Sequence, residues 1–203
     1  DLSGCTELKE LDCRRNQLES LDVSKNTLLQ LLYCGANPIS SLDVSQNTDL
    51  VELNCDENSL TELDVSKNTK LEKLRCYYNK LTSLNVSENA ALKTLDCRNN
   101  QLTSLDVSKN TELTDLECTN NKIYSLDVNN CSSLENLYIG ANPIVALRCG
   151  SVNTSVLVFS PLDMFGITDA DTFDITKYGG SAENIVKDSI KGGTLEKGII
   201  VPN

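Results

Sequence analysis

Apolar and polar positions alternate along this chain in a pattern that repeats every 21 residues. One unit reads Leu-x-x-Leu-x-Cys-x-x-Asn-x-Leu-x-x-Leu-Asp-Val-Ser-x-Asn, and its first Leu recurs without insertion or deletion at positions 8, 29, 50, 71, 92, 113 and 134. A unit this short cannot bury its own apolar face and must stack on its neighbours. The pattern therefore predicts a solenoid of seven coils over residues 1–150.

Each unit contains two versions of one shorter pattern, ten and eleven residues long. The stretches around Leu11 and Leu21 alternate inward and outward with the two-residue period of a strand. Asn16 and Asn26 follow them, where a short amide can bond the backbone groups of a turn. No segment has the length or spacing of a helix. We expect two ladders of short parallel strands, one on each face, and a comparatively straight rod, because both faces would have the ~4.8 Å strand spacing.

Residues 151–203 leave the repeat and are predicted to form a small C-terminal β cap. Terminal coils would otherwise expose apolar faces and strand edges. A separate ligand-binding module is the alternative. The patterns predict a strand at Val152–Phe159, a residual coil edge at Phe173–Lys177, and a hairpin of Ile185–Ile190 and Thr194–Val201 that turns at Gly192-Gly193.

Charge and composition exclude several classes of function. The net charge is −11 and the pI near 4.5, which disfavours nucleic acid and anionic membrane surfaces as partners. No apolar run approaches the ~20 residues of a membrane helix, so no membrane insertion is expected. The chain has no His, which removes the commonest general base and metal ligand. We therefore predict that it is not an enzyme; an enzyme would need converging acids in a pocket, such as one around Asp163 to Asp174.

Cysteine recurs at one inward position of the repeat. Zinc sites converge four ligands, whereas these side chains would point the same way. Disulfides need Cβ atoms ~3.8 Å apart, closer than neighbouring strands. We interpret the column as small apolar side chains in the core, with no metal and no cofactor. Nine thiols would suit a reducing or anaerobic habitat. The column contains Cys13, Cys34, Cys55, Cys76, Cys97 and Cys118, with Ile139 in the seventh coil.

A column of acidic residues marks the second face. Stacked carboxylates repel, so calcium is one candidate partner, but the glycine pattern of calcium-binding β-rolls is absent and Asn85 interrupts the column. We favour carboxylates that accept hydrogen bonds from turn amides. Asp169, Asp171 and Asp174 lack the Gly and Glu of an EF-hand and are interpreted as solvated turn residues. The column contains Asp22, Asp43, Asp64, Asn85, Asp106 and Asp127.

The segment Leu8–Asn16 and its six later copies resemble the leucine-rich-repeat motif, Leu-x-x-Leu-x-Leu-x-x-Asn/Cys. The chain is most similar to the 21-residue, doubly nested class found in bacterial surface and secreted proteins, where Leu-Asp-Val-Ser-x-Asn recurs. The resemblance covers about three quarters of the chain. It implies a right-handed, mainly β solenoid and a role in recognition outside the cell.

Binding specificity is expected where the repeats differ, on the outward positions beside the Leu-x-Cys strands. Tyr and Arg are enriched among interface hot spots, and they gather in the middle of the chain. The same side chains can also stabilise a sheet surface that binds nothing. The candidate partner-binding residues are Tyr33, Arg75, Tyr77, Tyr78, Asp96, Arg98 and Tyr138.

These observations lead to one functional expectation and one alternative. We expect a non-catalytic scaffold that binds a protein or a glycan at a bacterial cell surface or outside the cell. The alternative is a spacer that holds another domain away from the cell. Asp1–Cys5 aligns with Asp22–Asn26, so the chain begins in the middle of a repeat, and we expect that a targeting segment has been removed.

Overall fold

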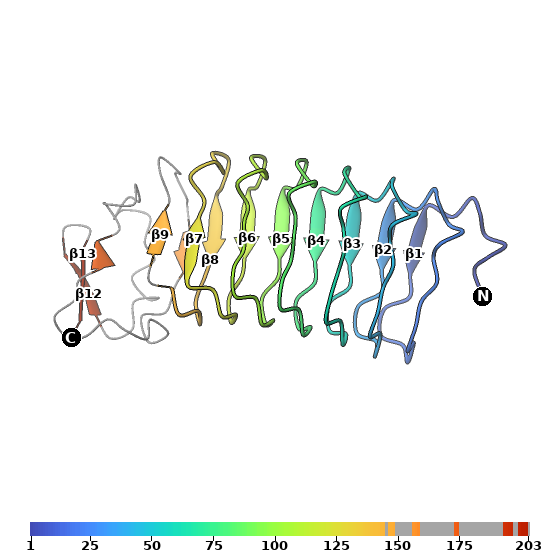
Figure 1. The fold of residues 1–203 in the computed structure, drawn as a ribbon, viewed down its shortest axis with the longest axis horizontal. Helices are drawn as coiled ribbons and strands as arrows, with labels where there is room; N and C mark the ends of the chain where they lie inside the picture. Colours follow the sequence, from blue (N-terminus) through green and yellow to red (C-terminus); the bar gives the residue numbers. More distant parts are fainter. Residues whose placement is uncertain (145, 149–155, 159–172, 175–192, 197–198, 203) are drawn as a thin grey trace.

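The computed structural model describes residues 1–144, 146–148, 156–158, 173–174, 193–196 and 199–202. Over these residues the chain is a parallel β-solenoid of about seven turns (Figure 1), which confirms the fold predicted from the repeat. The described residues contain no helix, and hence none of the length and apolarity needed to cross a membrane.

Eight short strands form one parallel sheet in the order β1-β2-β3-β4-β5-β6-β8-β10. Each strand from β1 to β6 pairs with residues 21 positions later, so Leu11 lies beside Leu32 and Leu32 beside Leu53. β8 pairs with β10 at a separation of 20 residues. Parallel strands in register place equivalent positions of successive repeats in columns along the solenoid. The strands are Glu10–Asp12 (β1), Leu31–Tyr33 (β2), Glu52–Asn54 (β3), Lys73–Arg75 (β4), Thr94–Asp96 (β5), Asp115–Glu117 (β6), Asn136–Tyr138 (β8) and Val156–Val158 (β10).

The core consists of aliphatic and cysteine columns stacked along the solenoid axis. Leu74 and its equivalents in the neighbouring coils are completely buried, as are five of the six cysteines of the column. The eight described cysteines are free thiols, as the strand geometry predicted. Burial raises the pKa of the Cys34 thiol to about 12, so it is a neutral, apolar filler at physiological pH.

Two rows of buried asparagines fasten each coil to the previous one. In the row that follows the sheet, Asn79 Nδ2 donates to the carbonyls of Cys55 and Cys76 at 3.0 and 3.1 Å, while its Oδ1 accepts from Leu60 N at 2.9 Å. In the other row, Asn68 Nδ2 donates to the carbonyls of the coil before it. These side chains satisfy buried backbone groups that strands leave unpaired at each turn.

The second face differs from the expected continuous ladder. It holds one parallel strand pair, β7 (Ser125–Asp127) with β9 (Ala146–Arg148); the described coils before it cross this face in turns. In those coils a side chain of the following coil bonds the carbonyl just after this segment: Asn47 does so at Val23 O, and the Cys131 thiol takes the same place at Val107 O.

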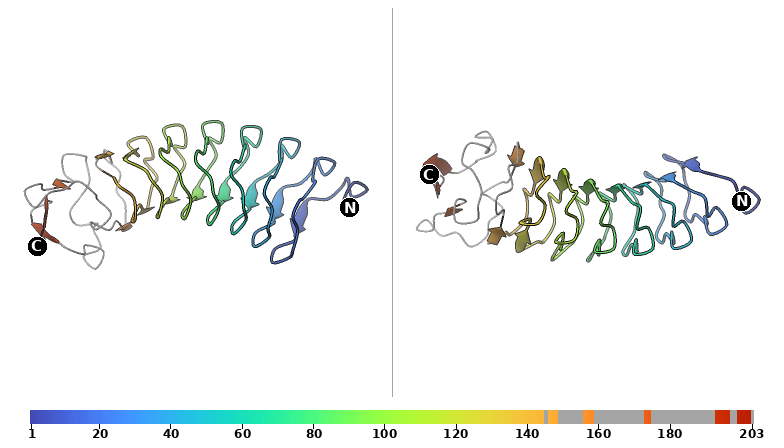
Figure 2. Two further views of the ribbon diagram at one scale, coloured as in Figure 1. Left: turned by 60° about the horizontal axis from the view of Figure 1, so that its bottom comes forward. Right: turned by 90° about the horizontal axis from the view of Figure 1, so that it is seen from above.

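The solenoid is bowed, with the eight-stranded sheet on its concave side in both views of Figure 2. The prediction of a comparatively straight rod was therefore wrong. It assumed paired strands ~4.8 Å apart on both faces, whereas most described coils cross the second face without pairing. From here on, the eight-stranded sheet is called the concave sheet.

The described strands of the C-terminal segment correct two further predictions. β12 (Gly193–Glu196) and β13 (Ile199–Pro202) pair antiparallel, so the expected strand at 194–201 is itself a hairpin and Gly193 belongs to a strand. β11 (Phe173–Asp174) pairs antiparallel with β13, which no parallel coil edge could do. β10 lies within the strand predicted at 152–159, and the segment 185–190 lies outside the described residues.

Candidate functional site

The concave sheet presents its outward side chains in rows across the coils. One row runs through the last residue of each strand, and it is Asp12, Tyr33, Asn54, Arg75, Asp96, Glu117 and Tyr138. The row differs at nearly every step in charge or size, while the buried column between the outward rows is Leu in every coil. Neighbouring strands lie ~4.8 Å apart, so each side chain can reach the adjacent coils.

Four of the predicted site residues come together around the side chain of Tyr77. The Arg98 guanidinium lies over the Tyr77 ring, 4.5 Å from its centroid, and the Tyr78 ring meets the Tyr77 ring edge-on at 5.8 Å. Arg98 is also held by Glu117 at 2.8 Å and lies 3.6 Å from Asp96. We call Tyr77, Tyr78, Asp96 and Arg98 the Tyr77 cluster. Its members stand on two consecutive coils and hold one another in place.

The other predicted residues lie outside this cluster. Arg75 turns to Glu52 of the preceding coil, at 3.0 Å. Tyr33 lies two strands from β4, and the Arg14 guanidinium lies over its ring, 5.0 Å from the ring centroid. Tyr138 stands on β8, beside Glu117 in the sheet register. The structure therefore places the seven residues on one face but divides them among separate contacts.

Asp96 supplies the carboxyl group of the Tyr77 cluster, and the pKa of this group is shifted by its surroundings. Its side chain is almost fully buried, and burial raises its pKa to about 6, with a further increase from the nearby charge of Glu117. Arg98 opposes this shift. The centre of the concave sheet thus contains a carboxyl group that changes charge just below neutral pH.

Tyr78 is the exposed aromatic residue of the cluster, with 54% of its surface accessible. It has a φ of 51°, in the left-handed region that bulky residues rarely adopt. The same position has positive φ in every coil, at the turn that leaves the concave sheet, and in two coils it is occupied by Asn99 and Asn120. A tyrosine held in this conformation projects its ring from the edge of the sheet, where a partner can reach it.

A hollow of about 480 Å³ adjoins the cluster on the side of the earlier coils. Its lining includes Arg14, Gly35, Asp56, Glu57 and Tyr77. At the position filled by Arg14, Asp56 and Tyr77 in coils one, three and four, the second coil has Gly35, so the row has a gap there. Asp56 forms one wall, and only 6% of its surface is exposed.

The second face is chemically uniform by comparison. The Asp106 carboxylate accepts a hydrogen bond from Ser108 N at 2.9 Å, and the equivalent bond forms in each described coil from Asp22 to Asp127. Asn85 makes it with its amide oxygen at 3.0 Å, which explains why Asn is tolerated in the column. The hydrogen bond from Ser108 lowers the pKa of Asp106. The prediction that these residues bond turn amides is confirmed.

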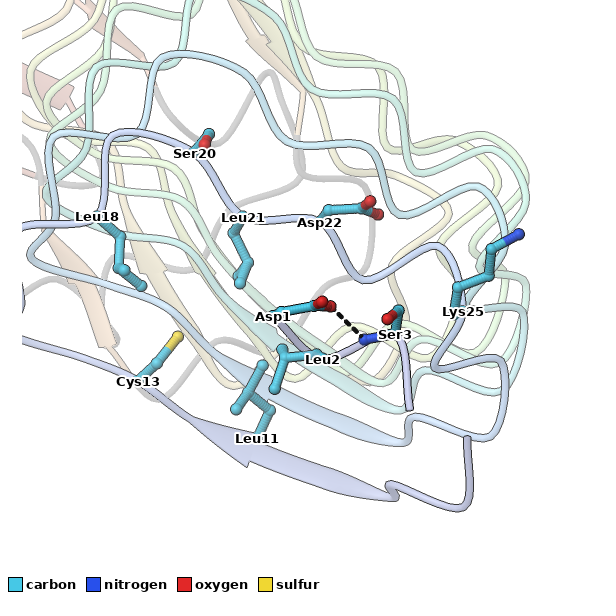
Figure 3. A pocket seen from close by; sticks show the side chains of 10 residues that line it. All are labelled: Asp1, Leu2, Ser3, Leu11, Cys13, Leu18, Ser20, Leu21, Asp22 and Lys25. Atoms are coloured by element: carbon cyan, nitrogen blue, oxygen red, sulfur yellow. Dashed lines mark hydrogen bonds between the residues drawn. The ribbon is translucent and has the colours of Figure 1, made fainter. Parts of the chain in front are cut away.

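A second hollow, of about 420 Å³, lies at the N-terminal end of the solenoid (Figure 3). Leu11, Leu18, Leu21 and Cys13 point into it, and Asp1 accepts a hydrogen bond from Ser3 N at its rim. The equivalent side chains in the inner coils are buried because a coil covers them on each side. This hollow is therefore the uncovered edge of the core, and its shape follows from stacking.

Sequence reasoning missed three residues that shape the site: Arg14, Gly35 and Asp56. Gly35 carried a signal, because it is the one small residue between large polar ones in its row of the first four coils. Tyr124 was also missed; it is 59% exposed and precedes β7, away from the Tyr77 cluster. Among the described residues, no group of three or more Cys, Asp or Glu is arranged to hold a metal ion.

Comparison with known proteins returned no matching family model and no matching curated protein. Solved structures do match. The functional domain of InlJ from Listeria monocytogenes, described as including a cysteine ladder, is 32% identical, with a TM-score of 0.59 over 78% of this chain and 44% of that one. A leucine-rich-repeat protein of Leptospira interrogans is 26% identical, with a TM-score of 0.72 over 80% of this chain and 47% of that one.

An internalin of Listeria monocytogenes, InlF, has the same fold at 22% identity and a TM-score of 0.60, over 80% of this chain and 52% of that one. The chain spans about half the length of these three structures. Its fold is the leucine-rich-repeat solenoid, and bacterial leucine-rich-repeat proteins are among its structural neighbours.

Proposed function

We propose that this chain is a non-catalytic recognition scaffold that binds a protein partner along its concave sheet, centred on the Tyr77 cluster. The observation that carries the proposal is the contrast between the faces. Outward residues of the concave sheet change from coil to coil. Those of the second face repeat, and their Asp carboxylates accept hydrogen bonds from the backbone of their own turns. A fold tolerates such variation only where stacking does not fix the residue.

The Tyr77 cluster has the properties of an interface hot spot. Tyr77 and Arg98 are already immobilised by their mutual contact and by Glu117, so binding would cost little side-chain entropy. Tyr78 adds an exposed ring beside them. A central aromatic anchor with its charges already paired suits a protein surface better than a small ligand, because the hollow beside it is lined mainly by polar and charged residues.

The place of action is part of the same proposal. The neighbours from Listeria and Leptospira support a bacterial protein that acts at the cell surface or after secretion. A glycan is the second class of partner to test, since exposed tyrosines also stack on sugar rings.

A spacer role is the alternative function, and the Asn rows favour it. Each coil is fastened to the next by buried side-chain hydrogen bonds, which makes a stiff rod whatever its surface binds. A pure spacer has no use for a variable face, so the two functions make opposite predictions for concave-sheet variants.

The test begins with capture of partners by the 203-residue chain, in parallel with a glycan array. The affinity of the captured partner is then measured for the double variant Tyr77→Ala/Tyr78→Ala, with Tyr124→Ala as the matched control. Loss of two anchoring rings should weaken binding by roughly thirtyfold or more, and the control should bind normally. Unchanged affinity in the double variant would refute the proposed interface.

A further inference from the structure

Asp96 shares one guanidinium group with a second acid. Its carboxylate lies 3.6 Å from Arg98 Nη2, while Arg98 Nη1 donates to Glu117 Oε2 at 2.8 Å. Asp96 and Glu117 stand side by side in the register of β5 and β6, where like charges repel each other. When both acids are ionised, two negative charges therefore face one positive charge.

The surroundings of Asp96 do little to offset this excess of negative charge. Arg75, its neighbour on β4, is paired with Glu52 at 3.0 Å. The Asp96 side chain is 12% exposed, so little water reaches the carboxylate, and burial disfavours its charged form. Protonation of Asp96 would leave Arg98 and Glu117 as a balanced ion pair. The charged and titratable groups that face Asp96 are Arg75 from β4, Arg98 from its own turn, Glu117 from β6 and, in the core, the thiols of Cys76 and Cys97.

The fold does not require a carboxylate at position 96. Asp96 Oδ1 accepts a hydrogen bond from Arg98 N at 3.3 Å, and in the third coil the amide oxygen of Asn54 accepts the equivalent bond from Asp56 N at 3.2 Å. Asn54 and Asp96 are both buried. An amide therefore satisfies this turn as well as a carboxylate does. What the carboxylate at position 96 adds is a site that can bind a proton.

We propose that Asp96 is a proton switch in the concave sheet, and that the protein partner binds more tightly when Asp96 is protonated. The inference rests on the proposed function and deepens it, because it states how binding at the Tyr77 cluster is regulated. A partner that covers Tyr77 also removes water from the partly exposed Arg98, which lies over its ring, and from Glu117 beside it. Covering two acids and one guanidinium group buries an uncompensated charge, whereas covering the protonated form buries a balanced pair.

The direction of the pH effect follows from linkage. Asp96 has a pKa of about 6 in the free chain, and the bound chain should hold the proton more tightly. Affinity is therefore highest below the pKa of the free chain, and it falls as the pH rises through the pKa of the complex. A tenfold difference in proton affinity between the two states would weaken partner binding by up to about tenfold from pH 5 to pH 8.

Carboxyl titration by ¹³C NMR tests the switch without a partner. The Asp96 Cγ signal should titrate with a midpoint near 6, and the Nε–Hε signal of Arg98 should shift with the same midpoint, because the two groups are in contact. Asp106 on the second face is the internal control, and its midpoint should lie below the ordinary range of aspartate. In Glu117→Gln the midpoint of Asp96 should fall, because a like charge has been removed. A midpoint for Asp96 near the ~3.9 of an unfolded aspartate would overturn the proposal.

Partner affinity measured from pH 5 to pH 8 tests the consequence for binding. Asp96→Asn removes the proton site, and Asn54 shows that an amide fits this row; any pH dependence that belongs to the partner is retained. The ratio of the wild-type Kd to the variant Kd should therefore rise by up to about tenfold over this range. Asp43→Asn makes the same charge change on the second face, where Asn85 occupies the column, and its ratio should not change with pH. A ratio for Asp96→Asn that stays constant or falls with rising pH would overturn the switch.

The outcomes separate the switch from the proposed function. Unimpaired partner binding by Tyr77→Ala/Tyr78→Ala would refute the interface, and with it any regulation of binding there. Impaired binding by that variant, together with a Kd ratio for Asp96→Asn that does not change with pH, would sustain the interface and refute the switch alone.

Discussion

The two faces of this solenoid are built from the same repeat but use their polar groups differently. On the second face, each Asp bonds the backbone of its own turn, so its surroundings are the same in every coil. On the concave sheet, outward side chains bond across coils, as Arg98 does with Glu117, and the partners differ from coil to coil. An Asp that hydrogen-bonds its own turn is kept in every coil. Outward side chains of the concave sheet have no such bond to their own turn, so they can vary and be selected for binding.

The largest effect that separates the faces should come from their asparagine rows. Asn79, behind the concave sheet, uses both its amide nitrogen and its oxygen, whereas the Oδ1 of Asn68, on the second side, has no partner. Asn79→Ala should therefore lower the free energy of unfolding by about 3 kcal/mol and Asn68→Ala by about 2 kcal/mol. Urea denaturation measures both values; the reverse order would contradict this account of the rows.

The next effect concerns the buried acid of the Tyr77 cluster. The pKa of Asp96 is about 6 in the folded chain, above the ~3.9 of an unfolded aspartate. The folded state therefore binds the proton more tightly, and the free energy of unfolding should fall as the pH rises from about 4 to about 6. Asp96→Asn should be more stable than the wild type at pH 7 by about 2 kcal/mol.

Denaturation of both proteins from pH 4 to pH 7 checks this prediction. The stability difference between them should grow from pH 4 to about pH 6 and then level off towards pH 7. A difference that stays constant from pH 4 upward would show that Asp96 ionises normally in the folded protein.

Backbone strain should distinguish the faces by a smaller amount. Non-glycine residues with positive φ all lie, among the described residues, at the turn leaving the concave sheet. Ala36 is one of them, with φ 55°, and Ala36→Gly should raise the free energy of unfolding by roughly 0.5–1 kcal/mol. Ala91 lies in a second-side turn without positive φ, and Ala91→Gly should be destabilising. If both substitutions destabilise equally, strain at this turn is negligible.

The smallest effect is expected on the second face. Asp106 is exposed and its pKa is lowered by the amide of Ser108, so its contribution to stability is present at neutral pH and is lost as the pH falls through the folded pKa. This sign is opposite to that of Asp96. Because solvent screens the group, Asp106→Asn should change the free energy of unfolding at pH 7 by less than about 0.5 kcal/mol. A loss several times larger would mean that the column is not the passive face described here.

The sequence predicted those parts of the structure that depend on strict periodicity. The two-residue alternation around Leu11 and Cys13 identified the strands, the core columns and the face on which variable residues lie. The Asp column was predicted for the same reason, since an isolated Asp-x-Ser turn needs no information from other coils. Because each coil contacts only its neighbours, the pattern within one repeat is enough to predict the structure at these positions.

The bow of the solenoid and the details of the site required three-dimensional information. Leu-Asp-Val alternates like a strand, yet among the described residues the second face pairs only at β7 and β9, so alternation alone did not predict how this face is built. Likewise, the reason for a glycine at position 35 is visible only in the structure, where the Asp56 side chain of the next coil occupies the space that a Cβ would need. Pattern analysis considers one position at a time and does not reveal such contacts between coils.

The central claim, that recognition belongs to the concave sheet, is tested most directly by site-specific photo-crosslinking to the captured partner. A photoreactive phenylalanine analogue is placed at Tyr33, Tyr78 or Tyr138 on the concave side and at Ser20, Ser41 or Ser83 on the second side. Crosslinks to the partner from the first group, strongest at Tyr78, and none from the second group are the predicted result. Crosslinks from the second group alone would contradict the account.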